Sequence, residues 1–95
     1  MTATIADLDA GVRDQIMQRL KSIEGQARGI QRMVDDQRSC QEIMDQIAAM
    51  RAASHALSVQ LLEEFALHCL RTADDFPSFE QAVAQMVSVV SKLTR

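Results

Sequence analysis

From Cys40 to about Thr72 the chain contains neither glycine nor proline, and this run constrains the fold more than any other feature. It predicts one long helix, because its apolar residues recur at helical spacing: Ile43, Ile47, Met50, Leu57, Leu61 and Phe65. Such a helix is roughly 45 Å long, whereas a compact domain of this size has a radius of gyration of about 13 Å. Two shorter helices cannot cover that much apolar face. We therefore expect it to pair with the same helix of a second copy, antiparallel and about a two-fold axis.

The remaining chain predicts two more helices, so the expected fold class is all-α with a three-helix protomer. Three glycines, one proline and a 47% apolar content without Trp or Tyr favour helix over strand. The first helix is expected from about Gly11 to Val34, where Gly25 and Gly29 indicate close backbone packing by another helix or by a partner. Its apolar residues fall in a stripe about 80° wide: Ile16, Leu20, Ile23, Ala27, Ile30 and Val34.

Short polar segments mark the helix ends. Residues 35–39 read as a connection, with Ser39 as N-cap and Glu42 completing a capping box. Residues 74–77 end the long helix, and residues 78–81 form a second capping box that opens a third helix reaching Leu93. Residues 1–10 are expected to be a short, flexible lead-in, so residues 1–95 form a single domain.

The two cysteines, Cys40 and Cys69, lie at opposite ends of the predicted long helix. Their separation along one continuous helix is about 43 Å, far beyond the limit of about 7 Å for a disulfide. In an antiparallel dimer, Cys40 of one helix comes beside Cys69 of the other, and two-fold symmetry makes two such sites. A helix N-terminus favours a thiolate, so Cys40 is the expected nucleophile and Cys69 the resolving thiol. The alternative is that both cysteines are ordinary small buried residues.

Other chemistry is less well supported by the sequence. His68 and Cys69 diverge by about 100° on a helix, so a shared metal site is not expected and His68 is placed at the surface. His55 is interpreted as structural. No catalytic triad, paired-carboxylate or phosphate-loop pattern occurs, so no enzyme activity and no cofactor are expected. No membrane span or secretory signal is recognised, which predicts a cytoplasmic protein with reduced thiols.

Basic residues gather on one face of the first helix although the net charge is −3. Residues 15–33 carry four basic side chains and one acidic one, Glu24. Of the four, Lys21, Arg28 and Arg32 lie within about 40° of each other, roughly opposite the apolar stripe. Repeated in several subunits, this face could neutralise many phosphates. The alternative is an ordinary solvated helix face.

Long motifs resemble the family of copper-sensitive operon repressors (CsoR) over most of the chain, roughly Val12 to Val90. They are RLKSIEGQARGIQRM at 19–33, then Cys40, then QIAAMRAA at 46–53 and LLEEFALHCL at 61–70. The resemblance implies a three-helix protomer, an antiparallel four-helix-bundle dimer, and a tetramer made of two dimers. It also implies operator binding through Arg19 and Arg51, with Lys21, Arg28 and Arg32 contacting phosphates.

The sensing positions distinguish the branches of this family. Copper sensors resemble this chain at both cysteines, but their histidine falls at Phe65. The Tyr and Glu that surround their metal ligands fall at Ser39 and Gln85. The nickel and cobalt sensors need more histidines, and the formaldehyde sensors need an N-terminal proline and the same missing histidine. The surviving cysteine pair resembles the persulfide-sensing branch, the CsoR-like sulfurtransferase repressors (CstR).

The sequence therefore predicts a cytoplasmic homotetrameric repressor of operator DNA. Sulfane-sulfur donors, meaning persulfides or polysulfides, are expected to persulfidate and cross-link Cys40 and Cys69 of opposite protomers and release the DNA. One alternative is a Cu(I) sensor that uses the same two cysteines, since soft thiolates bind Cu(I). A second is a sulfur-relay protein that binds no DNA.

Overall fold

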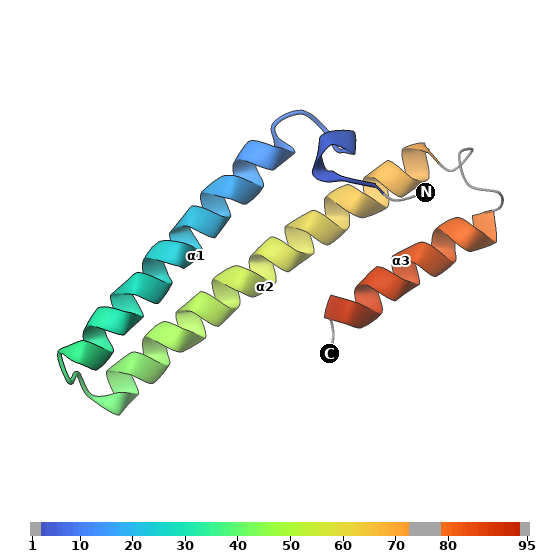
Figure 1. Ribbon diagram of the computed structural model, residues 1–95. Helices are drawn as coiled ribbons and strands as arrows, with labels where there is room; N and C mark the ends of the chain where they lie inside the picture. The colour runs from blue at the N-terminus through green and yellow to red at the C-terminus, as the bar shows by residue number, and fades with distance from the viewer. Residues whose placement is uncertain (1–2, 73–78, 94–95) are drawn as a thin grey trace. The chain divides into compact units, whose positions relative to one another are not determined.

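The computed structural model describes residues 3–72 and 79–93, and all regular structure within them is helical (Figure 1). A short 3-10 helix, η1 (Ile5–Asp7), precedes three α-helices: α1 (Val12–Asp35), α2 (Cys40–Arg71) and α3 (Phe79–Leu93). The all-α class and the number of α-helices are confirmed, and the expected bounds are met to within one residue. The expected capping residue Ser78 and the segment 74–77 lie outside the described residues.

The turn between α1 and α2 uses backbone hydrogen bonds at both ends. At the end of α1, Arg38 N–H donates to Met33 O (3.0 Å) and Gln37 N–H donates to Val34 O (3.1 Å), while Gln37 takes a left-handed φ of 56°. This is a Schellman motif with glutamine at the position that glycine usually occupies. Ser39 caps α2 as predicted, because its Oγ accepts a bond from Glu42 N–H at 3.1 Å.

Residues Asp14–Leu57 form one compact unit, here called the hairpin unit. It consists of most of α1 and the first half of α2, which run side by side in opposite directions (Figure 1). Ile16 is its single buried side chain, whereas Leu20, Val34, Met44 and Ile47 are 43–60% exposed. Two helices cannot enclose a core, so much of the predicted apolar stripe stays uncovered.

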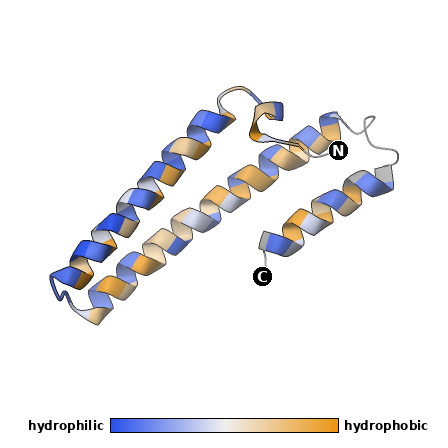
Figure 2. Ribbon diagram, viewed as in Figure 1, coloured by the Kyte–Doolittle hydropathy of each residue, from blue (hydrophilic) through white to orange (hydrophobic). Residues whose placement is uncertain are grey.

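The second unit, called the terminal unit, contains the described residues of Met1–Arg13 and Ser58–Arg95. It joins η1, the second half of α2, and α3, and its buried side chains are Val12 and Cys69. Figure 2 shows hydrophobic residues along both of these helices. Many remain exposed, and the most exposed are Leu70 at 64% and Val87 at 57%.

The N-terminal segment, expected to be a flexible lead-in, folds onto the end of α2 in this unit. Thr4 and Asp7 form a capping box around η1, and Ile5 and Leu8 are half-buried. Asp9 accepts a hydrogen bond from Arg71 Nη1 at 2.5 Å, across 62 positions of sequence. The apolar side chains and this ion pair explain why the segment is held.

Among the residues that the structure describes, no other part of the chain packs closely against the glycine pair in α1. A Cβ built on Gly25 or Gly29 would meet no atom within 4 Å. Packing by another helix of the same chain is therefore not the reason for these glycines. Close approach by a partner remains the other interpretation.

We expect Asp9→Asn to loosen the N-terminal segment from α2. The Arg71 guanidinium beside Asp9 lowers the pKa of that carboxyl. The ion pair therefore stabilises the folded segment fully at pH values above the ordinary Asp pKa. It is lost as pH falls through the lowered pKa. Hydrogen exchange should show a smaller protection factor for the Leu8 amide in the variant, and in the wild type in acid. The amides in the middle of α1 serve as the control, and an unchanged Leu8 protection factor would contradict the prediction.

Candidate functional site

Cys40 is exposed and is the first residue of α2. The Ser39 cap fixes where the helix starts, and the Glu42 carboxylate pairs with Arg38, whose Nε donates at 2.8 Å. The thiol therefore stands at a well-defined helix N-terminus, where free backbone N–H groups and the helix dipole favour an anion. The role of Cys40 as nucleophile stays a prediction.

Cys69 has the opposite environment. It lies in the last turn of α2 and is only 2% exposed, the most buried side chain among the described residues. Burial raises the pKa of this thiol, because the thiolate would lose its hydration. Cys69 is therefore held as a neutral thiol, which suits a resolving partner better than a first attacker.

The structure does not bring these two thiols together within one chain. Cys40 belongs to the hairpin unit and Cys69 to the terminal unit, and α2 is continuous between them. At 1.5 Å per residue, the intervening helix is about 43 Å long. Any joint site of the two cysteines therefore needs a second chain.

An apolar groove of about 450 Å³ lies in the terminal unit, on the helix face that leads to Cys69. Phe65, one turn before Cys69, lines it together with Gln85 of α3. Phe65 and Gln85, which the sequence analysis aligned with sensing positions, therefore meet in one groove. The other lining residues come from η1, α2 and α3: Ala3, Thr4, Ile5, Leu8, Ser58, Leu61, Leu62 and Val89.

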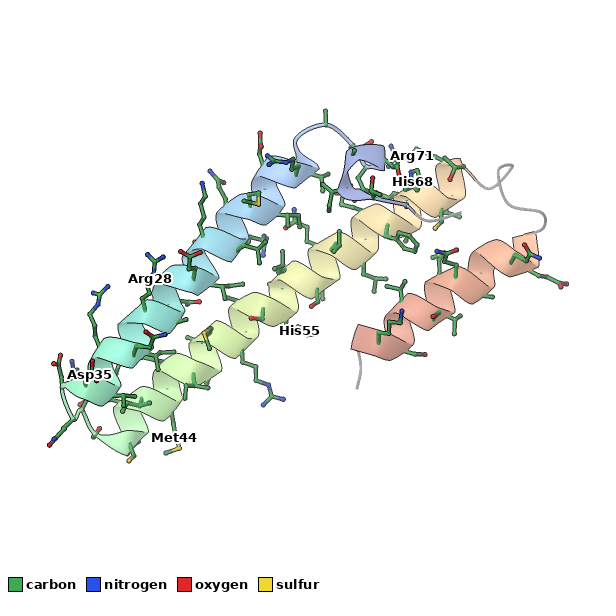
Figure 3. All side chains as sticks on the ribbon, in the orientation of Figure 1. Arg28, Asp35, Met44, His55, His68 and Arg71 are labelled. Carbon is green, nitrogen blue, oxygen red and sulfur yellow. The ribbon has the colours of Figure 1, made fainter. Side chains whose placement is uncertain are left out.

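His68 is not at the surface as expected. Its ring is half-buried, and its Nε2 is buried without a hydrogen-bond partner in the described part of the chain. Figure 3 shows His68 and Arg71 beside the folded N-terminal segment, which explains the burial. His55, by contrast, is exposed on the hairpin unit and lines a shallow hollow of α2.

A three-ligand metal site of the Cys-His-Cys type does not fit this chain. Phe65 has no donor atom, and within residues 3–72 and 79–93 no group of three His, Cys, Asp or Glu side chains could hold a metal ion. The thiols of Cys40 and Cys69 are the soft donors that remain at the expected positions.

All five predicted DNA-contacting residues lie on the hairpin unit and are exposed. Arg28 forms an ion pair with Glu24, one turn earlier on α1 (Figure 3). The other four make no ion pair with the residues that the structure describes: Arg19, Lys21, Arg32 and Arg51. These four charges are available to a polyanion.

Sequence reasoning missed one side chain near the Cys40 thiol. Met44 lies one turn after Cys40 and is 60% exposed (Figure 3). It lines the shallow hollow of α2 with Ile47, Arg51 and His55. Its spacing of four residues from Cys40 was the available signal, because such residues share one helix face.

Cys40 should react with alkylating reagents faster than Cys69 at neutral pH, by at least about tenfold, because Cys69 is shielded and its pKa is raised. Brief treatment with iodoacetamide followed by peptide mass spectrometry measures both rates. In denaturant the two rates should become similar. Faster labelling of Cys69 in the folded protein would contradict the assigned environments.

Comparison with known proteins places this geometry in context. A model of the family described as "Metal-sensitive transcriptional repressor" matches residues 12–92. The copper-sensing transcriptional repressor CsoR of Bacillus subtilis is 45% identical over 83 residues, covering 87% of this chain and 82% of that protein. The copper-sensing transcriptional repressor RicR of Mycobacterium tuberculosis is 31% identical over 85 residues, covering 87% and 88% of the two chains.

Solved structures agree with these sequence matches. The copper-sensing repressor CsoR with Cu(I) from Geobacillus thermodenitrificans is 38% identical, with a TM-score of 0.78 over 100% of this chain and 94% of that one. The nickel-responsive transcriptional regulator InrS also has a TM-score of 0.78, at 29% identity over 84% of this chain and 90% of that one. The chain therefore belongs to the family of metal-sensitive transcriptional repressors.

Proposed function

We propose that this repressor is a cytoplasmic homotetramer that releases operator DNA when reactive sulfur species join Cys40 to Cys69 of the partner subunit. The observation that carries the proposal is Phe65. It lines an apolar groove one turn before Cys69, where the copper sensors of the family carry histidine. Because Phe65 supplies no imidazole, the reactive groups that remain at the site are the two thiols. No enzymatic turnover is part of this function.

The uncovered apolar residues support self-association. In the hairpin unit Met44 and Ile47 are 60% and 44% exposed, and in the terminal unit Val83 and Val87 of α3 are 42% and 57% exposed. Monomeric proteins rarely leave so many large apolar side chains in water. Antiparallel pairing of α2 about a two-fold axis would cover the first set, and pairing of two such dimers would cover more.

The basic face of the hairpin unit supports operator binding. Lys21 and Arg32 lie within about 20° of each other on α1, and Gly25 lies within about 40° of Lys21. Because the Gly25 backbone is open, a phosphate could approach α1 closely at this point. Four copies of this face would concentrate positive charge where DNA binds, although each chain is acidic overall.

The proposed switch is a pair of thiol exchange reactions. The Cys40 thiolate attacks the sulfane sulfur of a persulfide donor, the donor S–S bond breaks, and the donor thiolate leaves with the bonding electrons. Cys69 of the partner subunit then loses its proton and attacks the inner sulfur of the Cys40 persulfide, releasing hydrosulfide. Two thiols are oxidised to a disulfide, and one sulfane sulfur is reduced. A longer polysulfide donor can leave additional sulfur in the bridge.

A polysulfide should link two protomers covalently through Cys40 and Cys69 and release the DNA. Non-reducing electrophoresis, intact mass measurement and a mobility-shift assay test this together. Cys40→Ser should abolish both persulfidation and release, because the first attacking thiol is gone. Cys69→Ser should leave a persulfide on Cys40 without a cross-link.

Two results would overturn this mechanism. A cross-link that persists in either single variant would rule out the pairing of unlike cysteines. A fully cross-linked protein that still binds its operator with undiminished affinity would rule out the switch.

Operator binding should be strongly salt-dependent, with affinity falling at least about tenfold between roughly 50 and 200 mM salt. Arg51→Ala should lower the affinity by at least about tenfold without loss of helical content, since the change is repeated in every subunit. Arg38→Ala is the matched control, because Arg38 is an exposed arginine of the same unit that pairs with Glu42. Equal effects of both variants would show that only total charge matters.

Cu(I) sensing through the same two cysteines is the second candidate. It is favoured by the copper-sensing relatives in Bacillus subtilis and Mycobacterium tuberculosis. Thiolates are soft ligands and can hold Cu(I) without an imidazole. A Cu(I) titration beside the polysulfide experiment separates the two candidates by which agent releases DNA.

A further inference from the structure

Met44 and Cys40 share one exposed face at the beginning of α2. They are four residues apart in a continuous helix, so their Cβ atoms are about 5–6 Å apart and one lies above the other. Nothing in the hairpin unit covers either side chain, and Met44 is 60% exposed. A thioether on three rotatable bonds can turn toward the thiol, so this face offers two soft sulfur donors.

The two halves of α2 carry matching surfaces. The hollow of the hairpin unit is lined by Met44, Ile47, Ala48 and Arg51, together with Ala52 and His55. The α2 residues that line the groove of the terminal unit are Ser58, Leu61, Leu62 and Phe65. The four groove residues are spaced by three, one and three residues, and the six residues of the hollow repeat the same spacing from Met44 to His55, as expected for one helix face.

Antiparallel pairing superimposes these two sets when Cys40 lies opposite the partner's Cys69. Stepping along both helices in opposite directions then places Met44 opposite the partner's Phe65 and Ile47 opposite the partner's Leu62. It also places Ala48 opposite the partner's Leu61 and Arg51 opposite the partner's Ser58. Four of the six positions of the hollow thus meet the four α2 positions of the groove. The helix register inferred from the cysteines is therefore one of those that align the two surfaces.

We propose that Cys40 and Met44 of one protomer, with the partner's Cys69, form a Cu(I) site with three sulfur donors. This rests on the antiparallel pairing in the proposed function. Met44 stands opposite the partner's Phe65, so its thioether takes the place of the imidazole that Phe65 lacks. Two thiolates and a thioether suit Cu(I), whereas Ni²⁺ and Zn²⁺ sites commonly draw on nitrogen donors. Binding releases two thiol protons and involves no change of oxidation state.

The variant that isolates the thioether is Met44→Leu, which keeps the apolar volume and removes the sulfur. Competition with bicinchoninate should show that Cu(I) affinity falls at least about tenfold, and X-ray absorption should show one sulfur ligand fewer. His68→Ala should change neither quantity, although His68 adjoins Cys69 and has a buried Nε2. In a Phe65→His background the loss caused by Met44→Leu should shrink, because an imidazole again supplies the third donor.

Unchanged affinity and an unchanged sulfur count in Met44→Leu would overturn the proposal. The Cys40→Ser and Cys69→Ser variants show whether the pairing of the two cysteines has failed or only the role of Met44. If they lose Cu(I) binding and polysulfide cross-linking while Met44→Leu behaves as wild type, the thiol pair stands and Met44 is only a packing residue. If all variants keep wild-type Cu(I) binding, the cysteine pairing itself is wrong for this metal. A loss in His68→Ala alone would assign the third donor to the histidine.

Discussion

The continuous helix α2 is the constraint on which the rest of this protein depends. It runs from Cys40 to Arg71 without a break, and its two halves belong to different compact units of the chain. In each unit a second helix covers part of α2 and leaves large apolar side chains exposed, such as Met44 and Leu70. Large apolar side chains of this helix stay uncovered in the described part of the chain, which supports the antiparallel assembly proposed above.

The same helix separates two thiols with different reactivity. Cys40 stands in solvent at a capped helix N-terminus, and Cys69 is enclosed near the other end with its pKa raised by burial. A site that combines them would therefore contain one exposed thiol and one enclosed thiol. This asymmetry gives an order to a two-step sulfur exchange. The same two thiols are also soft donors that could bind one Cu(I) ion.

Family membership fixes the class of regulator more firmly than the inducer. The curated relatives are copper-sensing repressors, yet the side chain one turn before Cys69 is Phe65. Phe65 and Gln85 line one apolar groove, so the position of the usual nitrogen ligand has become part of a hydrophobic surface. Persulfide sensing and a Cu(I) site completed by Met44, the two proposals made above, both start from Phe65.

The sequence by itself determined the three helices, because apolar periodicity, the Ser39 cap and the glycine-free run from Cys40 are local properties of the chain. It also located both cysteines and the basic face of α1. Only the tertiary structure decided that the N-terminal segment folds onto α2 through Asp9 and Arg71, and that Cys69 is enclosed while Cys40 is open. Burial and long-range pairing depend on residues far apart in the chain, such as positions 9 and 71, and no local pattern encodes which of them will meet.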